Sequence, residues 1–95
     1  MITLVTYDVS TIDADGCRRL RKVARICMSY GTRVQMSVFE CKITPAQRVQ
    51  LEEALREVID VERDSLRIYD LGSDPKGITH IGSKKPMDPD GLLMF

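Results

Sequence analysis

The amino-acid sequence predicts an α+β sandwich in which two helices cover one face of a small antiparallel sheet. Hydrophobic residues repeat with strand and helix periods in the order β-α-β-β-α-β, followed by a short extra C-terminal strand. The chain has 95 residues, which is enough for one domain with one core. Its composition, 43% hydrophobic and 29% charged, excludes disorder and collagen-like repeats. This order of elements is typical of the ferredoxin-like fold.

The first half of the chain begins with a strand and a helix. Residues 2–9 are rich in β-branched and aromatic side chains and predict a largely buried strand. Residues 10–16 are mainly Ser, Thr, Asp and Gly, which predicts a loop. From 16 to 30, apolar side chains recur at i, i+3 and i+4, which indicates an amphipathic helix that ends at Gly31.

The segment 33–43 alternates as extended chain, with Arg33, Gln35, Ser37 and Phe39 on one side. No Asn-Gly or Asp-Gly turn interrupts it, so periodicity leaves open whether it is one bent strand or two short strands. We expect this unmatched row to contribute to an interface on the open face of the sheet.

The second half of the chain repeats the helix and strand. Thr44 and Gln47 form a capping box with Pro45 at the first helical position, which predicts a second helix. Residues 65–71 return to strand alternation, and a short strand is predicted at 78–81.

We expect residues 1–81 to form the domain and residues 82–95 to form a C-terminal extension. The extension ends in four apolar residues, 92–95, which favours docking on the same domain or on a partner. A second copy of the chain would cover the open face of the sheet. We therefore predict a homodimer in which the extension docks on the partner.

Three cysteines, Cys17, Cys27 and Cys41, lack any C-x-x-C spacing and are expected to be reduced and mostly buried. No apolar run approaches the roughly 20 residues of a membrane span, and no basic region of a signal peptide precedes the first strand. We expect a cytoplasmic protein with no membrane partner.

The charge of the chain is unevenly distributed. The formal net charge is zero, from 14 basic and 14 acidic residues. Within residues 18–25, however, no acid interrupts a group of basic side chains, several of which share one face of the predicted helix. Contact with nucleic-acid phosphates and an ordinary solvated helix face both remain open. The group consists of Arg18, Arg19, Arg21, Lys22 and Arg25.

Asp8 is the sharpest candidate for chemistry, because it ends a buried strand directly after Tyr7. A carboxylate there could bind a divalent metal or cap the following turn. One carboxylate is sparse for a hydrolytic site, but a symmetric dimer would present it twice. Arg33, beside Phe39, could clamp a phosphate or meet a dimer partner. His80 lacks an acidic or thiol partner at catalytic spacing, which favours a structural role.

Taken together, several segments resemble the family of the smaller core protein of CRISPR adaptation. They are T-Y-D-V-S-T, G-C-R-R-L-R-K-V-A-R, G-T-R-V-Q-M-S-V-F-E-C and D-S-L-R-I-Y-D-L-G, with H-I-G and the apolar C-terminus. The resemblance implies a ferredoxin-like homodimer whose last strand crosses to the neighbouring protomer. It also implies a magnesium-dependent endonuclease acting on single-stranded RNA or double-stranded DNA. In that family the dimer bridges two dimers of the CRISPR integrase subunit and holds DNA.

The resemblance also implies roles for individual residues. The family's strand-end aspartate falls on Asp8, with Tyr7 before it, and its second-strand arginine and phenylalanine fall on Arg33 and Phe39. One Mg²⁺ between the two Asp8 carboxylates of a dimer would activate water, while arginines position the backbone. The helix bases match more loosely, since Leu20 stands where some relatives have arginine. A non-catalytic DNA-binding scaffold that bridges integrase dimers is the alternative.

Overall fold

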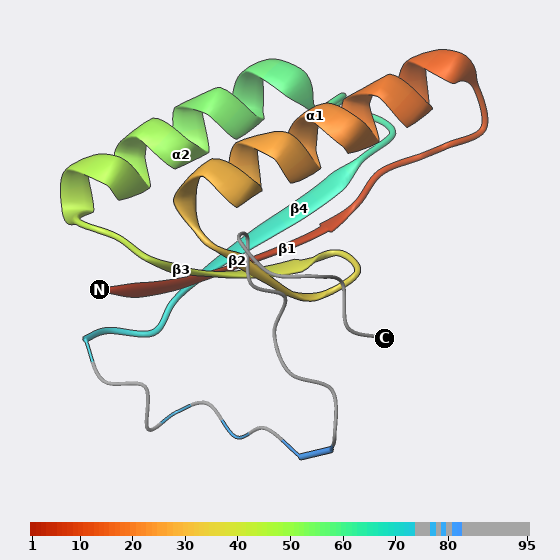
Figure 1. Ribbon diagram of the computed structural model, residues 1–95. Helices are drawn as coiled ribbons and strands as arrows, with labels where there is room; N and C mark the ends of the chain where they lie inside the picture. The colour runs from red at the N-terminus through yellow and green to blue at the C-terminus, as the bar shows by residue number, and fades with distance from the viewer. Residues whose placement is uncertain (74–76, 78, 80, 83–95) are drawn as a thin grey trace.

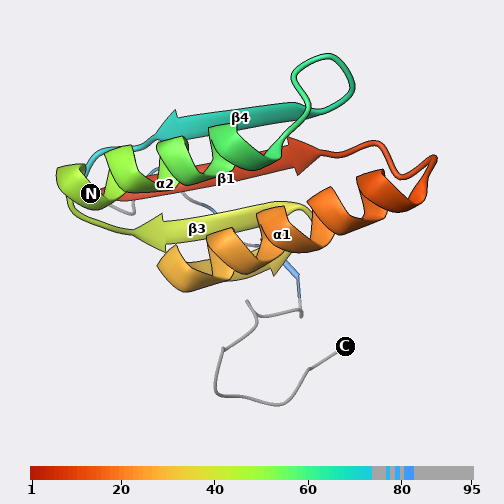
Figure 2. The ribbon, with the colours of Figure 1, turned by 90° about the horizontal axis from the view of Figure 1, so that it is seen from above.

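A computed structural model describes residues 1–73, 77, 79, 81 and 82 of the chain. Its elements are β1 (Ile2–Asp8), α1 (Ala14–Tyr30), β2 (Thr32–Gln35), β3 (Val38–Lys42), α2 (Pro45–Val58) and β4 (Ser65–Asp70). The strands form one antiparallel sheet in the order β2-β3-β1-β4. Both helices lie on the same face of this sheet (Figures 1 and 2). The predicted ferredoxin-like sandwich is confirmed.

The core lies between the sheet and the two helices. Alternation along β1 turns Val5 and Tyr7 toward the helices, and both side chains are buried. Leu51 and Leu55 from α2 are fully buried against them, as are Val23 and Cys27 from α1, Phe39 and Cys41 from β3. The opposite, open face carries the remaining side chains of each strand, including Asp8 at the end of β1.

Both helices begin at polar caps. The Thr44 side chain accepts a hydrogen bond from the Gln47 N–H at 3.2 Å, and the Gln47 side chain accepts one from the Thr44 N–H at 2.9 Å. The predicted capping box is therefore confirmed. Helix α1 begins earlier than predicted, because the Asp13 carboxylate accepts from the Gly16 N–H at 2.8 Å and caps the first turn.

Gly31 ends α1 as predicted, but for a packing reason rather than a conformational one. Its φ of −164° is extended backbone that any residue adopts. A Cβ at this position would overlap the Glu40 carbonyl oxygen and the Cys41 sulfur. Only glycine lets the chain pass from α1 into β2 so close to β3.

The segment 33–43 forms two strands, which settles the alternative left open by its periodicity. A turn over residues 36–37 joins β2 to β3, and the register shifts between Arg33 and Gln35. The prediction that one row of side chains lies on the open face is wrong. Arg33 pairs with Phe39, which is buried on the helix side, whereas the shift places Gln35 opposite Val38 on the other face.

The strand predicted at 78–81, the lone His80 and the extension beyond residue 82 lie outside the described residues, except for Thr79 and Ile81. The three cysteines are free; Cys27 and Cys41 are buried and Cys17 is half-buried. No helix in the described part of the chain is long and apolar enough to cross a membrane.

Candidate functional site

Asp8 lies at the end of β1, with its side chain on the open face and exposed. It pairs in register with Ser65, the first residue of β4, so the pairing between β1 and β4 holds its backbone. The carboxylate makes no hydrogen bond or ion pair with any other described residue. It is therefore free to accept an external ligand at this end of the sheet.

The chain on both sides of the Asp8–Ser65 pair is tied together by Asp64. Its buried carboxylate accepts hydrogen bonds from the backbone N–H of Ser10 at 3.1 Å and of Asp60 at 2.9 Å. It also binds the Arg19 guanidinium of α1 through Nε at 2.9 Å and Nη2 at 3.3 Å. Burial raises the pKa of Asp64, but these hydrogen bonds outweigh it and hold the pKa below the ordinary value.

A second ion pair closes the same end of the molecule. Arg63 donates to Asp13, the cap of α1, at 3.0 Å. These two residues line a hollow of about 390 Å³ together with Ser10 and Ile12, on the loop that follows Asp8. The hollow combines a guanidinium, a hydroxyl and an exposed apolar side chain.

The basic residues of α1 divide into two groups. Arg19 is largely buried in its pair with Asp64, and Arg18 pairs with Asp15 at 3.1 Å while staying exposed. The helix predicted from residue 16 excluded Asp15; because α1 begins at Ala14, Asp15 lies in its first turn and pairs with Arg18. Three further bases are exposed and have no ion-pair partner among the described residues: Arg21, Lys22 and Arg25.

The structure does not bring Asp8 and the exposed bases together within one chain. The bases extend from α1, which covers the helix side of the sheet, whereas Asp8 lies on the open face (Figure 2). A nucleic acid that touches both must pass around the edge of one chain or span two chains.

Arg33 and Phe39 do lie side by side, as their sequence pattern suggests. The Arg33 guanidinium carbon is 5.1 Å from the centre of the Phe39 ring, which in turn stacks on Tyr7 at 6.1 Å. Tyr7 donates to the Met36 carbonyl at 3.5 Å. Burial raises the pKa of Tyr7, against the opposing effect of Arg33. Arg33 Nε is buried without an acceptor in the described part of the chain.

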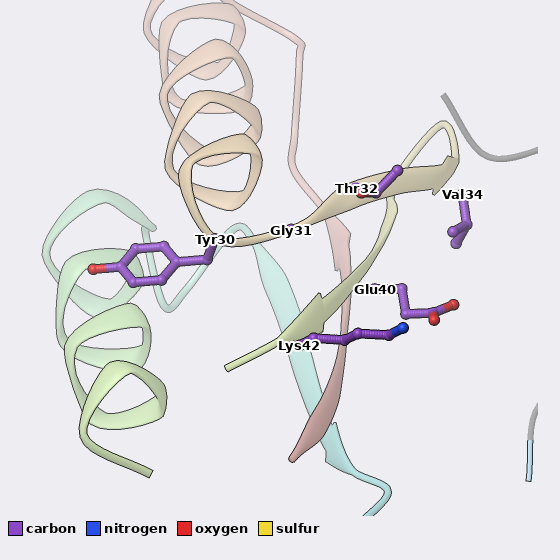
Figure 3. Close-up of a pocket in the computed structure, with 6 residues that line it drawn as sticks. All are labelled: Tyr30, Gly31, Thr32, Val34, Glu40 and Lys42. Atoms are coloured by element: carbon purple, nitrogen blue, oxygen red, sulfur yellow. The ribbon is translucent and has the colours of Figure 1, made fainter. Parts of the chain in front are cut away.

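A separate hollow of about 410 Å³ lies at the β2 edge of the sheet (Figure 3). Thr32, Val34, Glu40 and Lys42 line it, together with the end of α1 at Tyr30 and Gly31. Lys42 pairs with Ile2, at the opposite end of β1 from Asp8. This hollow is therefore distinct from the end of the sheet that carries the candidate carboxylate.

Sequence reasoning missed Asp13, Arg63 and Asp64. Asp64 ends an acidic turn and resembles an ordinary solvated charge, and its partner Arg19 is 45 residues away. The one local signal for the cap was the residue type of Asp13, an aspartate three positions before Gly16.

The fit of a metal to these residues depends on more than one chain. Within the described ranges, no three His, Cys, Asp or Glu side chains lie close enough to hold a metal ion. Asp8 supplies a hard oxygen donor of the kind that Mg²⁺ prefers, but only one. The donor set fits a divalent cation when a second copy adds its own Asp8.

Comparison with known proteins gives a consistent family. The model of the family described as CRISPR associated protein Cas2 matches residues 1–77. The CRISPR-associated endoribonuclease Cas2 of Chlorobaculum tepidum is 50% identical over 96 residues, with all of both chains covered. The CRISPR-associated endonuclease Cas2 of Halalkalibacterium halodurans is 49% identical, also over the full length of both.

A solved structure agrees in fold. The crystal structure of Streptococcus pyogenes Cas2 at pH 6.5 is similar to this chain with a TM-score of 0.76 and 47% identity. The match covers 86% of this chain and 100% of that one.

Proposed function

Since this chain belongs to the Cas2 family of CRISPR-associated proteins, we propose that it is an endonuclease that hydrolyses phosphodiester bonds in CRISPR adaptation. Relatives that are half identical to it over their full length carry the names endoribonuclease and endonuclease, which supports the activity. Its substrate is RNA or DNA.

One observation carries the proposal. Asp8 is an exposed carboxylate at a strand end, with no partner among the described residues, on a face of the sheet that the helices leave uncovered. Structural carboxylates of this chain, such as Asp64 and Asp70, are instead engaged by arginine. An unengaged carboxylate at a strand end that pairs with β4 is suited to bind a cation or a reacting water.

The proposed site is completed by a second copy of the chain. In a homodimer formed through the open face, the two-fold axis places the Asp8 carboxylates of both copies around one Mg²⁺. Bound there, the ion would lower the pKa of water and stabilise charge on the phosphate. The role of Asp8 is to hold the cation, and repulsion between the two carboxylates favours its uptake.

The basic face of α1 supplies the nucleic-acid contact in this proposal. We assign phosphate contacts to Arg18, Arg21, Lys22 and Arg25, which are exposed. Arg19 is left out because Asp64 engages its guanidinium. Arg33 is a support rather than a contact, because it packs on Phe39 on the helix side of the sheet.

The proposed partners follow from this arrangement. The dimer binds duplex DNA or single-stranded RNA and associates with the CRISPR integrase subunit. Three free thiols fit a reducing compartment, so we place the protein in the cytoplasm.

A scaffold without catalytic activity is the second candidate, and one observation favours it. Within the described residues no cluster of metal-ligating side chains forms, and three bases on α1 are free to bind phosphate. In this case the dimer holds DNA for the integrase, and Asp8 is a dimer-axis residue.

Purified wild type and Asp8→Asn, with and without Mg²⁺, distinguish the two candidates. The nuclease proposal expects cleavage of labelled RNA or duplex DNA to fall by about a hundredfold or more in the variant. Mg²⁺ should raise the melting temperature of wild type and do little for the variant, because the ion binds only the folded dimer. Equal cleavage by both proteins would refute the assignment of Asp8.

An integration assay with the integrase subunit tests the scaffold. Integration that persists in Asp8→Asn, while cleavage is lost, would show that binding alone serves adaptation. Arg56→Gln, which removes an exposed ion pair with Glu52 on α2, on the helix side of the sheet, is the matched control and should behave as wild type.

A further inference from the structure

We infer that Asp64 and Arg19 form a positioning pair for Asp8, an inference that rests on the proposed function. Asp64 is the residue before Ser65, the register partner of Asp8, and its carboxylate accepts the N–H of Ser10 at 3.1 Å. Ser10 lies two residues after Asp8. The Asp64 carboxylate thus links the two chain segments on either side of the Asp8–Ser65 pair.

Arg19 makes this link rigid. Its Nε and Nη2 donate to both oxygens of the Asp64 carboxylate, at 2.9 and 3.3 Å, in a bidentate geometry. The Asp64 side chain is fully buried and that of Arg19 is 16% exposed, so solvent screens the pair weakly. The carboxylate orientation that accepts Ser10 is therefore fixed from α1.

The absence of a side chain at Gly16 lets α1 approach the loop that follows Asp8. A Cβ on Gly16 would overlap the Ser10 carbonyl oxygen, so the first turn of α1 touches the loop directly. The backbone of Ser10 is thus held at two points: its N–H by Asp64, and its carbonyl against the backbone of Gly16. Asp8 itself needs no side-chain support, because the backbone that carries it is immobilised.

This assignment gives Arg19 a role other than phosphate binding. A guanidinium whose Nε and Nη2 donate to a buried carboxylate offers less to a phosphate than a free one, whereas Arg21 and Lys22 on the same helix are exposed. Asp64 and Arg19 are positioning residues: they touch neither the proposed metal nor the substrate, and act through the backbone of Asp8.

The test compares wild type with Asp64→Asn and Arg19→Lys, using whichever of a labelled duplex or a single-stranded RNA wild type cleaves in Mg²⁺. A misplacement of about 1 Å costs about a hundredfold in rate, so we expect kcat to fall tenfold to a hundredfold in both variants. We expect KM to stay within about twofold, because no substrate contact is removed. Arg56→Gln is the control and should keep the kcat of wild type.

Two further measurements separate positioning from phosphate contact. The slope of log Kd against log salt should be unchanged in both variants. If Arg19 were available to phosphate, loss of the Asp64 charge in Asp64→Asn would add a phosphate contact and steepen the slope by about 0.9, and Arg19→Lys would retain activity. The Ser10 amide should exchange with solvent at least about tenfold faster in Asp64→Asn, while the Val5 amide in the core keeps its protection.

The outcomes are distinguishable from those of the proposed function. Wild type that does not cleave refutes the function and the inference with it. Asp8→Asn that cleaves like wild type refutes the assignment of Asp8, and with it the inference. Cleavage that depends on Asp8 but is unchanged in Asp64→Asn and Arg19→Lys overturns the inference alone. Should Asp64→Asn fail to fold, Arg19→Lys, which keeps the charge, decides by its kcat and KM.

Discussion

At the scale of single residues, the carboxylates of this chain differ chiefly in what engages them. Asp64 is buried and accepts hydrogen bonds from Arg19 and from two backbone N–H groups. These bonds stabilise its charged form and lower its pKa in the folded state, although burial opposes them. Asp8 is exposed and has no such partner in the described part of the chain. Asp64 therefore stabilises the fold, whereas Asp8 is available for chemistry.

The lowered pKa of Asp64 predicts a loss of stability in acid. Because the unfolded chain binds the proton more readily, with a pKa of about 3.9, the stabilisation is fully present above that value and declines as the pH falls toward the folded-state pKa. Asp64→Asn should therefore show a shallower fall of the unfolding free energy between about pH 5 and pH 3 than wild type. Urea unfolding at a series of pH values measures this.

Asp15→Asn is the control for the acid experiment. Its carboxylate is 75% exposed in an i, i+3 pair with Arg18, which contributes little. This variant should follow the pH dependence of wild type. If the unfolding free energy of Asp64→Asn had the same pH dependence as that of wild type, the buried ion pair would contribute no stability linked to protonation.

At the scale of elements, α1 combines a buried face, a structural arginine and an exposed basic face. Replacing Arg18, Lys22 and Arg25 with Ala should weaken duplex binding and flatten its salt dependence. Each lost phosphate contact lowers the slope of log K against log salt by about 0.9. Fluorescence anisotropy from 50 to about 200 mM salt measures it, with Arg56→Gln as the control on α2. An unchanged slope would make these residues an ordinary solvated face.

The junction between α1 and β2 depends on the absence of a side chain at Gly31. Gly31→Ala places a methyl group against the Glu40 carbonyl and the Cys41 sulfur, and the backbone of β3 must move. We expect a destabilisation of about 1–3 kcal/mol, measured by urea unfolding. Gly77→Ala, whose Cβ meets nothing within 4 Å, should be neutral. Equal stability of Gly31→Ala and wild type would show that this junction yields without cost.

Short sequence motifs predicted the helices and strands well, but they could not predict contacts between residues far apart in the sequence. The capping box at Thr44 and Gln47 is contained in four residues, so the start of α2 could be read directly. The shift between Arg33 and Gln35 depends on pairing with β3, and it moved Gln35 to the face opposite Arg33 and Phe39. Within the candidate site, Asp8 was predicted from its place at a strand end. The Asp64–Arg19 pair was not, because it joins positions that only the fold brings together.

At the scale of the whole molecule, the sheet has helices on one face only (Figure 1). Burying the other face against a second copy would compensate for the small core of a 95-residue chain. We predict that a chain ending at Ile81 loses the dimer and part of its thermal stability, because the apolar end at residues 92–95 is removed. Light scattering and thermal melting measure both. A truncated chain that stays as dimeric and as stable as the full one would contradict this prediction.

The burial of two cysteines has a consequence for reactivity. Burial raises the pKa of Cys27 to about 12 and that of Cys41 to about 11, so both stay protonated at neutral pH and closed to reagents. Cys17 is half-buried on the first turns of α1, close to the loop that follows Asp8. The native chain thus offers one thiol for alkylation where the unfolded chain offers three. A fluorophore attached there would report on the end of the molecule where the proposed cleavage occurs, without engineering a new cysteine.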